Sequence, residues 1–394
     1  MGLAGAEKAL CELLRSIPAD AYNVSVLALI DRGELFAQLP ATATLLNKHP
    51  SRESVLGVRA ERFIAKRVLR AAFAHGSWLR NLLPTLREYR RMKRDRRVQK
   101  DKLFWRILSD GAPRFRKRFD LAVAYLEGGA TYYVADHVNA ARKLAFVHID
   151  YVAAGYTPAL DRGCYDAFAS VCVVSKEVGE KFVAVHPEQQ AKVRLFHNLL
   201  DVENIRRLAD SGEGFADGFT GKRLLSIGRL HPQKAYPTSI EVMKRLTDAG
   251  RDLRWYVLGE GAERPALEAL IHRQGLDGRF VLLGAKQNPY PYLKQADLYI
   301  HTTRFEGKSI AIEEAQALGK AIVASDCTGN REQIVNEVNG LLVPLEPEAI
   351  AEAIGLLLDH PDEAERLARQ SSYQREDRQK DVQWLLEQAE EASA

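Results

Sequence analysis

Short apolar runs alternate with helical periodicity through the second half of the chain. Because parallel strands buried on both faces are continuously apolar, this alternation predicts a doubly wound parallel α/β sheet. The predicted strands lie at 224–227, 255–258, 280–283, 298–301, 321–324 and 341–343. The first half is less regular, and its apolar runs predict strands at 22–30, 120–125, 144–147, 170–175 and 193–197.

The stretch from 297 to 326 predicts a strand, a loop, a helix that ends at Gly319 and a second strand. Ser309 is a predicted N-cap, so the loop 306–309 is expected to offer free backbone N–H groups at the positive end of a helix, which suits a phosphate. Glu306 follows the strand, where open α/β sheets bind ligands. Glu314 lies inside the helix with seven residues between it and Glu306, and it is placed to reach a ribose. The alternative is two solvated surface glutamates.

Cationic and polar residues follow other predicted strands. Gly228 and Arg229 follow the strand at 224–227, and Lys234 comes five residues after Arg229. The two cations can clamp a diphosphate. The alternative for the arginine is a surface salt bridge. His148 and Asp150 follow the strand at 144–147, where they could serve catalysis or acceptor orientation, although a lone histidine is more often structural.

Five sequence blocks, in order, resemble the retaining glycosyltransferase family 4, whose fold is GT-B. The block EGKSIAIEEAQALGKAIVASD, from Glu306 on, resembles the donor-site signature of this family. The other four are SIGRLHPQK (226–234), VLGEGAERPALEAL (257–270), NPYPYLKQADL (288–298) and NGLLVP (339–344). Two positions differ from the usual family pattern: Lys308 stands where phenylalanine is common, and Ala235 stands where glycine usually follows the lysine.

The resemblance implies a bacterial polysaccharide-biosynthesis enzyme that moves a sugar with retention from a nucleotide-diphosphate sugar, with UDP as the default nucleotide. It implies a glycan or lipid-linked saccharide as acceptor and no cofactor or metal. The implied catalytic residues are His148, Arg229, Lys234 and Glu306. The implied donor-binding residues are Gly228, Arg229, Lys234, Gly307, Lys308, Ser309, Ile310 and Glu314, and the implied acceptor-side residues are Gly5 and Asp150.

A chain of 394 residues is too long for one ordinary core. The resemblance implies two Rossmann-like domains facing a central cleft, at 1–200 and 201–372, and a C-terminal helix at 373–394 that packs back on the first domain. In the family a hydrophobic first strand precedes the glycine loop that contains Gly5. The sequence shows no such strand, so we expect the first strand of the N-terminal sheet to be missing.

Composition indicates a globular protein, with 46% hydrophobic and 27% charged residues. We expect no signal peptide, and no apolar run of the sequence is long enough to span a membrane. No CxxC pair occurs among Cys11, Cys164, Cys172 and Cys327, so we expect buried, reduced thiols and no zinc site.

Positive charge is concentrated in a predicted helical insertion at about 55–118. Residues 60–118 hold 19 Lys/Arg against 5 Asp/Glu, a net charge of +14, which leaves 4 − 14 = −10 for the remainder. Trp, Phe and Leu residues are interleaved with this charge, a pattern that suits either a solvated helical face or an anionic membrane surface. Nothing else in the chain supports nucleic-acid binding. We expect a cytoplasmic protein, peripheral on the inner face of the membrane.

Two other function classes stay open. A sugar-nucleotide epimerase shares the GT-B architecture but needs no acceptor, whereas a non-catalytic partner subunit of a transferase would neither transfer a sugar nor release nucleotide. Assays of nucleotide release with and without acceptor discriminate them.

Overall fold

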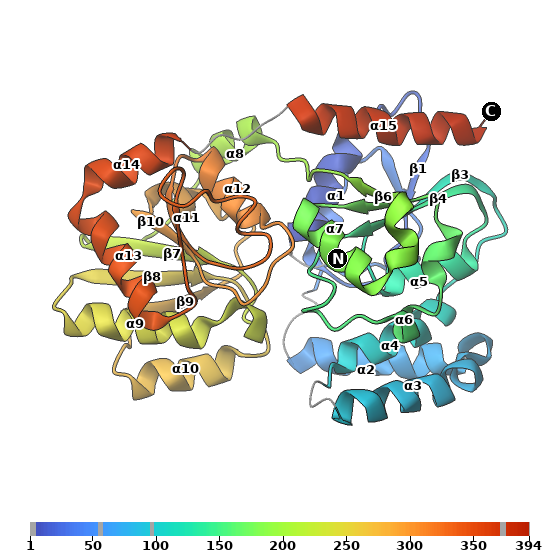
Figure 1. Ribbon diagram of the computed structural model, residues 1–394, viewed down its shortest axis with the longest axis horizontal. Coiled ribbons are helices and arrows are strands. Elements are labelled where there is room, and N and C mark those ends of the chain that lie inside the picture. The colour runs from blue at the N-terminus through green and yellow to red at the C-terminus, as the bar shows by residue number, and fades with distance from the viewer. Residues whose placement is uncertain (1–4, 54–57, 95–97, 371–375, 394) are drawn as a thin grey trace. The chain divides into compact units, whose positions relative to one another are not determined.

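The computed structural model describes residues 5–53, 58–94, 98–370 and 376–393 (Figure 1). The described chain divides into two compact units: Ala6–Leu199 together with the C-terminal helix form unit 1, and residues from Leu200 to Gln370 form unit 2. No described helix is both long and apolar enough to cross a membrane.

Unit 2 is a six-stranded, wholly parallel sheet in the order β12-β11-β10-β7-β8-β9. All six strands predicted in this half are confirmed: β7 (Lys222–Ile227), β8 (Leu253–Leu258), β9 (Phe280–Gly284), β10 (Leu298–His301), β11 (Ala321–Ser325) and β12 (Leu341–Val343). Its helices are α8 (Val202–Ala209), α9 (Tyr236–Asp248), α10 (Arg264–Arg273), α11 (Tyr290–Gln295), α12 (Ile310–Ala317), α13 (Pro347–Asp359) and α14 (Pro361–Arg369).

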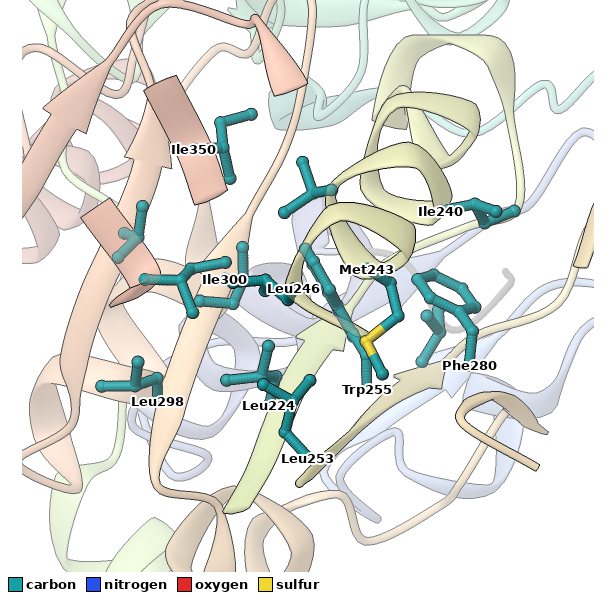
Figure 2. Close-up of a cluster of buried hydrophobic side chains, with 14 of the residues drawn as sticks. Leu224, Ile240, Met243, Leu246, Leu253, Trp255, Phe280, Leu298, Ile300 and Ile350 are labelled. Atoms are coloured by element: carbon teal, nitrogen blue, oxygen red, sulfur yellow. The ribbon is translucent and has the colours of Figure 1, made fainter. Parts of the chain in front are cut away.

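Apolar side chains fill both faces of this sheet. One cluster packs α9, α10, α13 and α14 against the strands, with Trp255 fully buried at its centre (Figure 2). The other packs α11 and α12 against the opposite face, around Tyr299 and Ile322. Because the central strands β8, β10 and β11 are buried on both faces, they are largely apolar, which is why these strands could be predicted from sequence.

Unit 1 contains a four-stranded parallel sheet in the order β3-β4-β5-β6 and a separate two-stranded parallel sheet, β1-β2. The strands are β1 (Val24–Val26), β2 (Ala43–Leu45), β3 (Phe119–Ala124), β4 (Ala140–Val147), β5 (Ser170–Val173) and β6 (Val193–Leu195). The helices are α1 (Gly5–Arg15), α2 (Val58–Phe73), α3 (Ser77–Arg94), α4 (Lys100–Asp110), α5 (Gly129–His137), α6 (Pro158–Asp161), α7 (Lys176–Val185) and α15 (Glu376–Ser393).

In unit 1 one strand prediction was wrong in detail and one strand was not predicted. The apolar run 22–30 predicted a long buried strand, but β1 spans only Val24–Val26 and buries one of its three residues, because it belongs to a two-stranded sheet. The strand β2 was not predicted, since Ala-Thr-Leu carries no extended apolar pattern. Among the described strands, β1 pairs only with β2 and β3 only with β4; the missing first strand stays a prediction.

The C-terminal helix α15 packs on unit 1 through polar and aromatic contacts. Asp381 accepts hydrogen bonds from the backbone N–H of His197 and lies 2.8 Å from its ring nitrogen Nδ1, while Arg378 donates to the carbonyl of Asn198. The Trp384 ring lies 4.2 Å from the guanidinium of Arg194. These contacts tie the end of the chain to β6 of the first unit, as the resemblance implied.

Candidate active site

The strand order of unit 2 places the predicted site at a topological switch point. Strands β7 and β10 are neighbours, but the helices that follow them, α9 and α12, belong to the cores on opposite faces of the sheet. In such sheets a crevice opens at the carboxyl ends of these two strands, and ligands bind there. Lys234 follows β7 and Glu306 follows β10, so the fold brings the two residues to the same sheet edge.

Lys234 and Glu306 form an ion pair. The Nζ of Lys234 donates a hydrogen bond to Oε2 of Glu306, and both side chains are largely shielded, with 14% and 16% of their surface exposed. The two loops are also joined by hydrogen bonds: Thr303 Oγ1 donates to the Gln233 carbonyl, and the Thr302 hydroxyl donates to that of Lys234. Hydrogen bonds between the two loops therefore hold Lys234 and Glu306 together, in addition to the attraction between their charges.

His301, at the last position of β10, completes the cluster and was not predicted as a site residue. Its Nε2 lies 3.6 Å from Oε2 of Glu306, and the residue is 3% exposed. Burial and the nearby charge of Lys234 lower the pKa of His301 to about 4, against the opposing effect of Glu306. Burial alone would raise the pKa of Glu306, but Lys234 and His301 outweigh it and lower this pKa to about 2. At neutral pH the cluster therefore holds a carboxylate, an ammonium and a neutral imidazole.

The folded protein should lose stability in acid through these two groups. Between pH 6.5 and about 4 the unfolded chain binds a proton at His301 that the folded chain excludes; between about 4.5 and 2 the same holds for Glu306. Both shifts therefore make stability fall as pH falls. Unfolding measured by urea from pH 7 to 4 should show this loss, and His301→Asn should flatten the part above pH 4.5. An unchanged slope in the variant would show that His301 is not the group responsible.

The hydrogen bonds of the loop after Glu306 differ from those predicted. Ser309 does precede α12, but its side chain does not cap the helix. Its backbone N–H is not free either: it donates to Oε1 of Gln333 at 2.7 Å, and Nε2 of Gln333 donates back to the Ser309 carbonyl at 2.9 Å. The expectation of a free N–H at Ser309 was therefore wrong, because Gln333 satisfies it. The first N–H groups of α12, at Ile310 and Ala311, have no partner within the helix.

Gly329 fits against the same loop and explains why a glycine is required there. It has φ +84°, and a Cβ at this position would lie 2.0 Å from the carbonyl oxygen of Gly307. The Glu306 N–H donates to the neighbouring Thr328 carbonyl at 3.1 Å. The segment 328–333 therefore supports the loop that carries Glu306.

Gly329→Ala should destabilise the protein more than a substitution with the same backbone strain and no clash. Gly250→Ala is the matched control, because Gly250 has φ +78° and nothing lies within 4 Å of its Cβ position. Each variant should lose about 1–2 kcal/mol of stability, because alanine disfavours the left-handed conformation. Gly329→Ala should lose about 1–3 kcal/mol more, because its Cβ overlaps the Gly307 carbonyl. Chemical denaturation measures both; equal losses would contradict the proposed packing of the loop.

The two glutamates of α12 are buried and have partners. Glu314 is 1% exposed and accepts a 2.9 Å hydrogen bond at Oε1 from the Tyr290 hydroxyl. Glu313 is 2% exposed and lies 3.7 Å from the ammonium of Lys308. The surface-glutamate alternative is thus excluded for Glu314, and Tyr290 is a second site residue whose contact was not predicted. Lys308, which stands where phenylalanine is common in the family, therefore pairs with Glu313.

The remaining residues of the predicted donor side lie on two tightly packed turns. Gly228 follows β7, and the Gly259 turn approaches it so closely that a Cβ on Gly259 would lie 1.8 Å from the Gly228 carbonyl oxygen. Arg229 is exposed. Ala235 is buried and adopts the left-handed conformation, φ 49°, which gives a physical reason for the glycine that usually stands there in the family.

In unit 1 the predicted residues have the following surroundings. The His148 ring packs against Tyr125 with centroids 4.8 Å apart, and burial lowers the pKa of His148. The backbone N–H of His148 donates to Oε2 of Glu127 at 3.0 Å. Asp150 is buried and accepts a 2.8 Å hydrogen bond from Ala153, so it stabilises the turn after β4. Gly5 begins α1. The roles of these three residues toward donor or acceptor stay predictions.

The chain is similar to known glycosyltransferases in its second half. Residues 218–375 match the family model of glycosyl transferases group 1. An N-acetylgalactosamine-N,N'-diacetylbacillosaminyl-diphospho-undecaprenol 4-alpha-N-acetylgalactosaminyltransferase of Campylobacter jejuni is 34% identical over 158 residues, 40% of this chain and 41% of that protein. An alpha-D-kanosaminyltransferase of Streptomyces kanamyceticus is 30% identical over 152 residues, 38% of this chain and 39% of that one. The match thus spans well under half of these relatives.

Solved structures extend the likeness to the whole fold. The Anabaena HepE structure in complex with UDP-glucose aligns with a TM-score of 0.62 and 17% identity over 99% of this chain and 95% of that one. A glycosyltransferase structure from Rickettsia africae aligns with a TM-score of 0.59 over 100% of this chain and 97% of that one. The fold is therefore GT-B, and residues 218–375 are similar to the group 1 glycosyl transferases.

Proposed function

We propose that this protein is a retaining glycosyltransferase that needs no metal and moves a sugar from a UDP-sugar to a glycan or lipid-linked saccharide in bacterial cell-surface polysaccharide synthesis. The observation that carries the proposal is the Lys234–Glu306 pair at the carboxyl ends of two neighbouring strands, β7 and β10. It provides a cation for a diphosphate and an ionised carboxylate for sugar hydroxyls within one site.

The leaving group is a diphosphate that gains negative charge as the glycosidic bond breaks. Lys234, the exposed guanidinium of Arg229 and the first N–H groups of α12 would stabilise that charge, in the place of a metal. Glu306 would hold the hydroxyls of the donor sugar. Glu314, held by Tyr290, would accept hydrogen bonds from the ribose.

Retention is best served by attack on the face that the leaving group occupies. The bond between the anomeric carbon and the diphosphate oxygen breaks, and its electron pair stays with the diphosphate. The acceptor oxygen bonds to the same face of the anomeric carbon, and its proton passes to the departing diphosphate. The transition state has oxocarbenium character, and a protein nucleophile takes no part. Glu306 stays ionised throughout, because Lys234 and His301 lower its pKa.

The choice of UDP and of a saccharide acceptor is supported by the proteins that this chain resembles. HepE was crystallised with UDP-glucose, and the Campylobacter relative is named for a diphospho-undecaprenol-linked acceptor. Those are properties of the other two proteins, and they define the substrates to test first.

A transfer assay tests the proposal. The full chain is incubated in EDTA with UDP-sugars, with and without undecaprenyl-diphosphate saccharides, and the released UDP and the anomeric configuration of the product are measured. We expect acceptor-dependent UDP release and an α-linked product from an α-linked donor. UDP release without acceptor, accompanied by an altered sugar, would identify an epimerase, and no release with any donor would indicate a non-catalytic subunit.

A further inference from the structure

Helix α3 of unit 1 has its polar face turned inward and its apolar face turned outward. The buried residues are Ser77, Asn81, Glu88 and Met92, whose spacing of four, seven and four places them on one helical face. The opposite face carries large apolar residues with 42–66% of their surface exposed: Trp78, Leu79, Leu82, Leu83, Leu86 and Tyr89. An ordinary surface helix has the reverse arrangement.

Hydrogen bonds on the inner face fix this orientation. The Asn81 amide nitrogen donates to Asp110 of α4 at 2.6 Å, and its oxygen accepts from Arg162 at 3.0 Å. The Ser77 hydroxyl donates to the Ile107 carbonyl at 3.3 Å. Rotating α3 to bury its leucines would break all three bonds and leave the buried partners Asp110 and Arg162 without Asn81. The apolar face is therefore a built feature of the folded unit.

Neighbouring helices extend the exposed apolar surface. Figure 1 shows α2, α3 and α4 side by side in unit 1. Leu69 and Phe73 on α2 are 61% and 70% exposed, and Phe104 on α4 is 37% exposed. Of the 14 large hydrophobic side chains exposed in the described chain, nine lie on these three helices, which we call the α2–α4 surface. Two other apolar residues of α4, Trp105 and Leu108, are instead packed inward.

The α2–α4 surface is also strongly basic. From Arg62 to Arg94 the chain has ten Lys/Arg and one Asp/Glu, a net charge of 10 − 1 = +9. The single acid, Glu88, is buried on the inner face of α3. The cations interleaved with the exposed apolar residues are Arg62, Lys66, Arg70, Arg80, Arg87, Arg90 and Lys93, all exposed. A partner for this surface must therefore be anionic and able to take up apolar side chains.

We propose that the α2–α4 surface docks on an anionic membrane surface. The leucine and aromatic side chains of α3 enter the boundary between headgroups and acyl chains, and the surrounding cations contact the lipid phosphates. A second copy of the chain fits less well, because two such surfaces would repel each other. Nucleic acid would satisfy the charge but would leave the leucines of α3 exposed to water.

Sedimentation with lipid vesicles tests the proposal and needs no sugar substrate, so its outcome is separate from that of the transfer assay. The full chain should bind vesicles of phosphatidylcholine with phosphatidylglycerol, bind vesicles of phosphatidylcholine alone far more weakly, and dissociate as salt is raised. The emission of the exposed Trp78 should shift to the blue on binding, and Trp78→Phe should lose that shift.

Two double variants and a control separate the contributions. Vesicle binding should weaken about ten-fold or more in each of two double variants, Leu79→Glu with Leu83→Glu and Arg87→Glu with Arg90→Glu. The reason is that each charge near an anionic membrane surface contributes substantially to the binding free energy. All four side chains are exposed, so the fold should be retained. Leu356→Glu, at a leucine of α13 that is 47% exposed, should bind like the unaltered protein.

Two results would overturn the proposal. One is that the unaltered protein binds neither vesicle type, or that the two double variants bind anionic vesicles as strongly as the unaltered protein. The other is a concentration-dependent dimer that Leu79→Glu with Leu83→Glu abolishes, which would identify a second copy of the chain as the partner.

Discussion

Replacing Lys234 by Met is expected to lower the transfer rate by about 10²- to 10³-fold, the usual cost of removing one group that stabilises developing negative charge. The ammonium is the charged group that the structure places directly beside Glu306, at the carboxyl ends of β7 and β10. Its loss removes charge from the diphosphate site and also leaves Glu306 without its ion-pair partner, so the pKa of Glu306 should rise. Initial rates at saturating donor measure the effect.

Lys222→Met is the matched control for this experiment. Lys222 lies in the same unit and pairs with Asp297, but it is 54% exposed and lies at the opposite end of β7. Surface pairs of this kind contribute little, so its rate should stay within about two-fold of the unaltered protein. A folded Lys234→Met protein with the same rate as this control would remove the basis for a diphosphate clamp at Lys234.

Glu314→Gln is expected to weaken UDP binding by about 10- to 100-fold, because a hydrogen bond to a charged group contributes about 1.5–3 kcal/mol. The carboxylate is buried in α12 and held by Tyr290, which leaves it suited to accept from ribose hydroxyls. Calorimetric titration of the unaltered and variant proteins with UDP measures the change.

A deoxy ligand shows whether the ribose is the group that Glu314 contacts. If it is, the same substitution should have a much smaller effect on binding of 2′-deoxy-UDP, because the interaction is already missing. Equal losses for UDP and 2′-deoxy-UDP would mean that Glu314 acts through the fold of the loop and not through the ribose.

The sequence was most informative where strands are buried on both faces. The central strands β8, β10 and β11 could be predicted because burial on both faces makes them largely apolar, whereas β2 escaped prediction because a three-residue strand in a two-stranded sheet has no such run. The inward polar face of α3 could not be predicted either. A helical pattern shows that two faces exist, but which one packs inward depends on partners such as Asp110 and Arg162.

The candidate site was predicted as separate parts, and the structure adds how they meet. Lys234 and Glu306 were expected to contact different portions of a donor, and their ion pair joins residues 72 positions apart. His301 was treated only as the end of a strand, although its position at the carboxyl end of β10 could have indicated a site residue. The bond from Ser309 to Gln333 involves a loop that sequence periodicity does not place.

The binding of nucleotides by the full-length chain tests the central claim most directly. Thermal unfolding is followed with UDP, GDP and ADP, each over a range of concentrations. UDP at about 100 times its dissociation constant should stabilise the protein by about 2.7 kcal/mol, and a 10- to 100-fold weaker affinity should reduce this to about 0.4–1.4 kcal/mol in Glu314→Gln at the same concentration. A folded protein that none of the three nucleotides stabilises would contradict the assignment of a nucleotide-sugar site to Lys234, Glu306 and Glu314.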